Sequence, residues 1–227
     1  MLRATCRLLR VLPSALVLCT VGPVTLAAQA FEGSVTMRVN LGARASAQTG
    51  AAATQQLEYQ VRGGKVRVNM GGPMGGMAML AVPQERKLYM LMAAQQAYME
   101  MPLAEAASAA SSAPEPDVKV TRTGKKETVA GLSCEHVLVA QGKATPTDIC
   151  ITTELGRYVD PGQVMRAGAV PAWQKQIGDG FPLKVTLPDG TVMMEAISVE
   201  KKRLSNDLFS VPSNYNKMAV PARRPPA

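Results

Sequence analysis

Apolar and polar residues alternate along much of this chain, which is the pattern of a β-strand with one dry face and one wet face. The alternation first occupies residues 31–40, returns at 57–61, and continues at 66–70 after the pair Gly63-Gly64. Two glycines between two alternating runs predict a hairpin. The first third of the chain therefore predicts an antiparallel sheet.

Further short runs of the same kind follow to the end of the chain. Those at 77–82, 87–92 and 97–101 are joined by four-residue connections, which favour an antiparallel meander. A sheet of this many short strands is expected to curl. We therefore predict a mainly β (α+β) fold class: a large curved antiparallel sheet, or half-barrel. The remaining runs are 118–122, 127–130, 134–140, 148–153, 181–187, 191–200 and 204–211.

One segment has helical spacing instead. Pro161 suits the first helical position, and Val170, Trp173 and Ile177 recur at three-then-four spacing. Pro171 must kink this segment or start a second short helix. We expect one short helical segment, and we place it on the concave side of the sheet.

The first thirty residues indicate export, and the rest of the chain is expected to form a single domain. Residues 1–30 hold three arginines, an apolar stretch at 11–18 and a small-x-small site at 28–30, which together predict a signal peptide, secretion across the inner membrane and a periplasmic location. We expect one β-rich domain over 31–220, with a flexible Ala/Ser/Pro-rich loop at 104–117. Residues 221–227 form a Pro/Arg-rich tail that we expect to be disordered.

Export changes the meaning of the charge and of the cysteines. The whole chain carries +8, but without the three arginines of residues 1–30 there are 22 basic against 17 acidic residues, or +5. The basic run 201–203 has no interleaved aromatic residues, so we predict no nucleic-acid partner. Two of the four cysteines remain, Cys134 and Cys150, and an oxidising compartment predicts that they form a disulfide.

The sequence Met-x-Met occurs three times in the predicted meander. Residues two apart on a strand face the same way, and simple hairpins would put residue 79 opposite 90 and residue 90 opposite 99. All six thioethers would then share one face. Three interpretations stay open: core packing, a deformable cavity for a lipid or other apolar ligand, and a Cu(I) site. The candidate ligand-binding residues are Met77, Met79, Met90, Met92, Met99, Met101 and, from the helical segment, Trp173.

Catalytic motifs are missing from the sequence. The single histidine, His136, follows Glu135, and neighbours on a strand point to opposite faces, so we interpret His136 as a structural residue. There is no Gly-x-Ser-x-Gly elbow, no paired-His zinc motif and no phosphate loop. We predict a non-enzymatic protein and assign no catalytic residue, no metal ligand and no cofactor.

Several short motifs occur in a fixed order along the chain, at residues 31–33, 64–67, 88–92, 98–102, 127–132, 134–136, 181–185 and 208–212. In this order they resemble a family of exported bacterial proteins, the domain of unknown function 4412. The family has no established activity, so the resemblance transfers no functional residue. Its general look is similar to the periplasmic lipoprotein carriers with a LolA/LolB-like half-barrel, which shelter acyl chains in a concave apolar cavity.

The resemblance and the methionine pattern lead to one functional hypothesis and two alternatives. The hypothesis is binding of a lipid or other apolar small molecule on a Met-rich concave face in the periplasm. One alternative is a periplasmic Cu(I)-binding protein that uses Met thioethers. The other is a structural envelope module in peripheral contact with the membrane or with envelope proteins.

Overall fold

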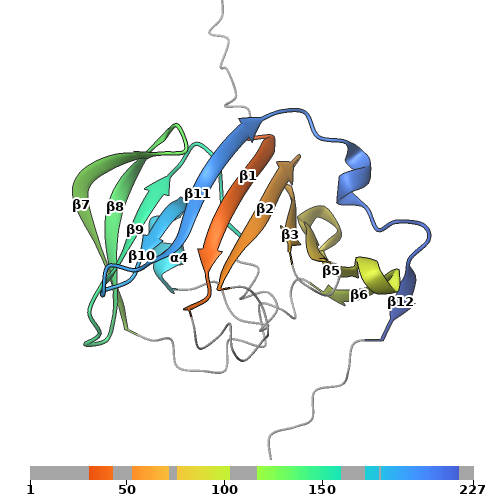
Figure 1. Ribbon diagram of the computed structural model, residues 1–227, viewed down its shortest axis with the longest axis horizontal. Coiled ribbons are helices and arrows are strands. Elements are labelled where there is room, and N and C mark those ends of the chain that lie inside the picture. The colour runs from red at the N-terminus through yellow and green to blue at the C-terminus, as the bar shows by residue number, and fades with distance from the viewer. Residues whose placement is uncertain are drawn as a thin grey trace, which may run out of the picture.

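The computed structural model (Figure 1) is described here for six stretches of the chain. The predicted signal peptide (1–30), the tail (221–227) and all but the last residue of the predicted loop (104–117) lie outside them. Within the described part, no helix is long and apolar enough to cross a membrane. The described stretches are residues 31–42, 53–71, 76–102, 117–159, 172–178 and 180–219.

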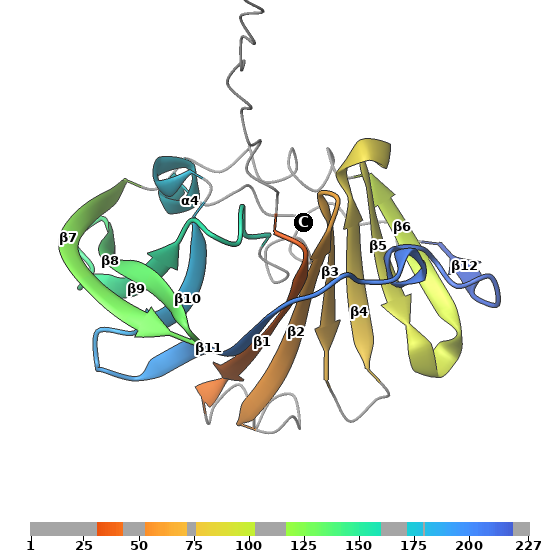
Figure 2. The same ribbon diagram turned by 90° about the horizontal axis from the view of Figure 1, so that it is seen from above.

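Within the described stretches, twelve strands form one open sheet, in which two meanders meet where β1 pairs with β11. Figure 2 shows the sheet curved into a half-barrel, as the sequence predicted. The sheet order is β12-β6-β5-β4-β3-β2-β1-β11-β10-β9-β8-β7. The strands are β1 (Gly33–Asn40), β2 (Thr54–Arg62), β3 (Lys65–Met70), β4 (Met77–Val82), β5 (Lys87–Met92), β6 (Ala97–Pro102), β7 (Val118–Val129), β8 (Leu132–Gln141), β9 (Thr147–Thr152), β10 (Phe181–Thr186), β11 (Val192–Lys201) and β12 (Asn216–Met218).

The hairpins of the first meander have the short connections that the sequence predicted. Single 3₁₀ turns, η1 (Pro83–Glu85) and η2 (Ala93–Gln95), join β4 to β5 and β5 to β6. Each turn closes on a residue with left-handed backbone, Arg86 or Gln96. These connections fix a register without bulges across β4, β5 and β6.

The concave face carries the main core. Tyr59 of β2 stacks on Tyr158, and its hydroxyl accepts a hydrogen bond from the Val159 backbone N–H at 2.9 Å. Phe181 meets both tyrosine rings edge-on, with centroids 5.1 and 5.2 Å away. The segment after β9 thus lies inside the curve of the sheet, as Figure 2 shows.

The predicted helical segment is confirmed in part as α4 (Ala172–Ile177), which begins at the residue after Pro171. It lies on the concave side beside β7, where Trp173 packs against the main core and Ile177 is buried. Residues 160–171, which include the predicted helix start, are outside the described part.

A second core lies on the convex face of β4 and β5. Leu80, Tyr89 and Leu91 are buried there under Leu204 and Phe209. These last two belong to residues 202–218, which we name the C-terminal strap. The strap includes the 3₁₀ turn η3 (Asn206–Phe209) and crosses the outside of the sheet toward β6.

The strap corrects two expectations. The run 204–211 was predicted as a strand, but it forms an irregular segment with one 3₁₀ turn, because its apolar residues pack side-on into the second core instead of pairing. β12 then joins β6 in parallel, so the sheet is not wholly antiparallel.

The runs 118–122 and 127–130 were predicted as separate strands, but they form the single strand β7 with a bulge between Arg122 and Lys126. The bulge lets the β7–β8 hairpin twist strongly. β7 consequently contacts β11, although strands four places apart in a flat sheet would be about 19 Å from each other.

Candidate functional site

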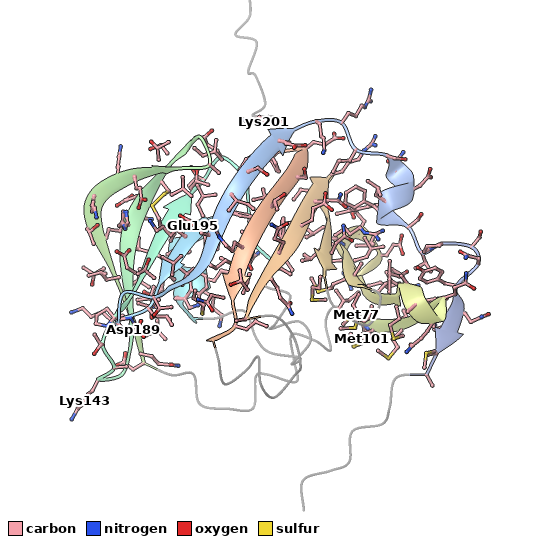
Figure 3. All side chains as sticks on the ribbon, in the orientation of Figure 1. Met77, Met101, Lys143, Asp189, Glu195 and Lys201 are labelled. Carbon is pink, nitrogen blue, oxygen red and sulfur yellow. A yellow bond between two sulfur atoms is a disulfide. The ribbon has the colours of Figure 1, made fainter. Side chains whose placement is uncertain are left out.

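The six candidate methionines share one face, as the hairpin registers predicted. Met79 lies opposite Met90, and Met90 lies opposite Met99. This row continues through Val68 to Tyr59, which carries the concave core. The six residues therefore line the concave face over β4, β5 and β6, and we name them the methionine face. Figure 3 shows its members Met77 and Met101 at this end of the molecule.

Exposure is graded across the methionine face. Met79 and Met90 are buried, with 0% and 4% of their surface exposed. Met92, Met99 and Met101 are half-buried, and Met77 is 42% exposed. The inner methionines act as core, while the outer ones retain accessible surface.

Trp173 lies apart from the methionine face. Its helix packs against β7, on the half of the sheet formed by β7 to β11, whereas the methionines lie on β4 to β6. The structure therefore brings the six methionines together and separates the tryptophan that the sequence had grouped with them.

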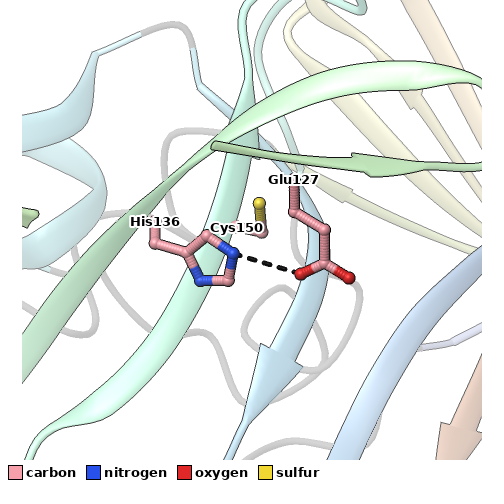
Figure 4. Close-up of side chains that lie close together, drawn as sticks. All are labelled: Glu127, His136 and Cys150. Atoms are coloured by element: carbon pink, nitrogen blue, oxygen red, sulfur yellow. Dashed lines mark hydrogen bonds and ion pairs between the residues drawn. The ribbon is translucent and has the colours of Figure 1, made fainter. Parts of the chain in front are cut away.

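A second cluster, on the opposite face of the sheet, was not foreseen from the sequence. The His136 ring, 7% exposed, places Nδ1 2.9 Å from Asp148 Oδ1 and Nε2 3.1 Å from Glu127 Oε2. Glu127 also accepts a hydrogen bond from Lys184 Nζ at 2.9 Å. Figure 4 shows Glu127 on the arched β7 and pointing toward His136 on β8. We name these four residues the His136 cluster.

Charges stabilise one another within the His136 cluster. The hydrogen bond from Lys184 lowers the pKa of the Glu127 carboxyl below its ordinary value, and the nearby His136 contributes to the same shift. The Glu127 carboxylate raises the pKa of the Lys184 ammonium in turn. Both groups are therefore charged at neutral pH, and together they tie the end of β7 to β10.

The predicted disulfide is confirmed beside this cluster. Cys134 and Cys150 are bonded, and both are buried, with 2% and 1% exposed surface. His136 is the register partner of Cys150 on β9, and Glu127 is the register partner of Cys134 on β8. The disulfide, Glu127 and His136 are therefore neighbours on β7, β8 and β9.

The family model of the domain of unknown function DUF4412 matches residues 31–215, which is most of the chain. The chain belongs to the DUF4412 family. A comparison with curated proteins gives no match.

Two solved structures are similar to this DUF4412 protein in fold. One is described as an uncharacterized conserved protein from Thermus thermophilus; it has a TM-score of 0.48 and 9% sequence identity, and the match covers 85% of this chain and 93% of that one. The other is MucB, with a TM-score of 0.37 and 13% identity over 81% of this chain and 57% of that one.

The methionine face of this DUF4412 protein has a signal in the sequence, whereas the His136 cluster has none. Met-x-Met repeats can be read directly once hairpins are assumed. The four cluster residues come from four strands and have no common spacing. Their meeting depends on the bulge in β7, a strand that the alternation pattern divided into two. The adjacent Glu135, which drew attention in the sequence, pairs with Arg122 instead, at 2.9 Å.

Proposed function

We propose that this protein is an exported, non-enzymatic periplasmic protein that binds a lipid or other apolar molecule on the methionine face. The observation that carries the proposal is the graded exposure of that face: a buried inner row continues outward into half-exposed methionines on the concave side of a curved sheet. Long unbranched thioethers adapt to ligands of varied shape.

Apolar contact supplies the binding energy in this proposal. Burial of apolar surface contributes roughly 25 cal/mol per Å². The half-exposed Met92, Met99 and Met101 lie near one another on β5 and β6, so one acyl chain could cover all three. The inner Met79 and Met90 would then form the floor beneath the ligand.

The other features fit a binding protein of the periplasm. The Cys134–Cys150 disulfide is suited to an oxidising compartment, in agreement with the predicted signal peptide. Both ring nitrogens of His136 face carboxylates. A histidine held in this way is suited to fixing the β7–β8 hairpin, which supports a structural role and not a catalytic one.

Uptake of a fluorescent fatty acid tests the proposal. We expect saturable binding by the mature protein, and at least about ten-fold weaker binding when Met99→Gln and Met101→Gln are combined, because amides replace apolar contacts. Met193→Gln is the matched control: Met193 is 38% exposed and neighbours Met194, so it points to the opposite face of β11. Absence of uptake, or equal loss in the control, would contradict the proposal.

A second candidate function is Cu(I) binding, and one observation favours it. Met79, Met90 and Met99 occupy a single row across three strands, where directly opposed side chains are near neighbours. Thioethers select Cu(I). Titration under reducing conditions tests this candidate: affinity that survives Met90→Leu and Met99→Leu would remove these residues from a copper site.

A further inference from the structure

Three potential metal ligands lie close together on the neighbouring strands β7, β8 and β9. A carboxylate oxygen of Glu127, a ring nitrogen of His136 and the sulfur of Cys150 all lie within 4.8 Å of one another. Figure 4 shows the three side chains close together. The sulfur of Cys134 adjoins them through the disulfide.

We propose that the Cys134–Cys150 disulfide masks a zinc site, which becomes available when the disulfide is reduced. The ligands would be the Cys134 and Cys150 thiolates, His136 Nε2 and a Glu127 carboxylate oxygen. Zinc prefers four ligands of these N, S and O types in tetrahedral arrangement. While the disulfide is intact, neither sulfur is a thiolate, and the site lacks its two strongest ligands.

The spacing of the two ligands that need no reduction suits zinc. His136 Nε2 and Glu127 Oε2 are 3.1 Å apart. Zinc bonds of about 2.0 to 2.1 Å at tetrahedral angles put neighbouring N and O ligands roughly 3.3 Å from each other. A zinc ion could therefore bind both atoms with little movement of either side chain.

Asp148 completes the arrangement as a positioning residue. Its carboxylate lies 2.9 and 3.0 Å from His136 Nδ1, so it accepts the Nδ1–H and leaves Nε2 as the ring atom that faces Glu127. A carboxylate that holds the far nitrogen of a histidine is the usual outer partner of a zinc-bound imidazole. The ammonium of Lys184, 2.9 Å from Glu127, already balances negative charge at this point and would be displaced or shared.

The chemistry balances with a dithiol as the reductant. Its thiolate attacks one sulfur of the Cys134–Cys150 bond, and the resulting mixed disulfide is resolved by the second thiol of the reductant. The reductant leaves as a cyclic disulfide, and two electrons and two protons convert the cystine to two thiols. Zinc binding then releases these two protons as the thiolates coordinate.

Cobalt titration of the mature protein, with and without prior reduction, tests the proposal. We expect the reduced protein to bind Co²⁺ with a sulfur-to-cobalt charge-transfer band and tetrahedral d–d bands, which zinc abolishes, and the oxidised protein to bind at least about 100-fold more weakly. Asp148→Asn is expected to weaken binding by about 10- to 100-fold while keeping the charge-transfer band. A reduced, folded protein without these bands would overturn the proposal.

Two variants and one linkage measurement keep the test sharp. His136→Gln is expected to retain the cobalt–sulfur band but lose affinity, whereas Cys134→Ser with Cys150→Ser is expected to lose the band. Zinc should also increase the fraction of protein reduced at a fixed dithiol ratio, because it binds only the reduced form. If zinc leaves the fraction of reduced protein unchanged, the disulfide does not mask a zinc site. Fatty-acid uptake by the serine double variant is expected to match that of the wild type, which keeps this result separate from the proposed lipid function.

Discussion

Replacement of both disulfide cysteines by alanine is expected to destabilise the protein by about 3 to 4 kcal/mol. The disulfide joins residues 16 apart, and closing a loop of this length removes entropy from the unfolded chain that corresponds to about 3 kcal/mol. Both sulfurs are buried, so the small void they leave adds about 1 kcal/mol. Domains commonly have about 5 to 15 kcal/mol of stability, so Cys134→Ala with Cys150→Ala is expected to remain folded.

Urea unfolding followed by tryptophan fluorescence measures this loss, because Trp173 of α4 is the single tryptophan of the chain. The double variant should unfold at lower urea, and the free energy of unfolding should depend at least as steeply on urea as in the wild type, because the unfolded chain without the crosslink is less compact. Wild-type protein unfolded without reductant should yield no alkylated thiol at Cys134 or Cys150. A difference in unfolding free energy below about 1 kcal/mol, or free thiols at Cys134 and Cys150, would refute the reasoning.

Three further substitutions test other parts of the structure. Lys184 lowers the pKa of Glu127, so the ion pair stabilises the fold above the unfolded pKa of about 4.3, and this stabilisation is lost as pH falls through the folded pKa. Glu127→Gln should therefore reduce the acid dependence of the unfolding free energy by about 0.2 to 1 kcal/mol. An unchanged profile of unfolding free energy against pH would count against the Glu127–Lys184 pair. Phe209→Ala should cost about 3 to 5 kcal/mol in urea unfolding if the C-terminal strap belongs to the cooperative unit, and no change would mean that it detaches separately. Gly33→Ala would place a Cβ 2.0 Å from the Glu200 carbonyl oxygen, so we expect the free energy of unfolding in urea to fall by more than about 2 kcal/mol. An unchanged unfolding free energy would contradict this packing.

The sequence was sufficient to predict most of the sheet, because alternation and turn residues are local signals. The hairpin through Gly63-Gly64 and the two four-residue connections formed as expected. The registers of β4, β5 and β6 then followed, and with them the shared face of the six methionines.

Long-range pairing could not be predicted in the same way. Nothing local in β1 and β11 identifies them as partners, although they join the two meanders at the centre of the sheet. The C-terminal strap has a strand-like composition, but its Leu204 and Phe209 pack onto the convex side of β4 and β5. The His136 cluster also depends on contacts between residues far apart in the sequence, because the curled β7 brings Glu127 to Lys184 on β10.

Native mass spectrometry of the protein purified from its native host tests the central claim most directly. We expect part of the population to carry a bound apolar molecule, which organic extraction releases and which the Met99→Gln, Met101→Gln double variant retains less well than Met193→Gln. A spectrum that shows only the mass of the polypeptide under gentle ionisation conditions, together with an extract free of lipid, would contradict the account.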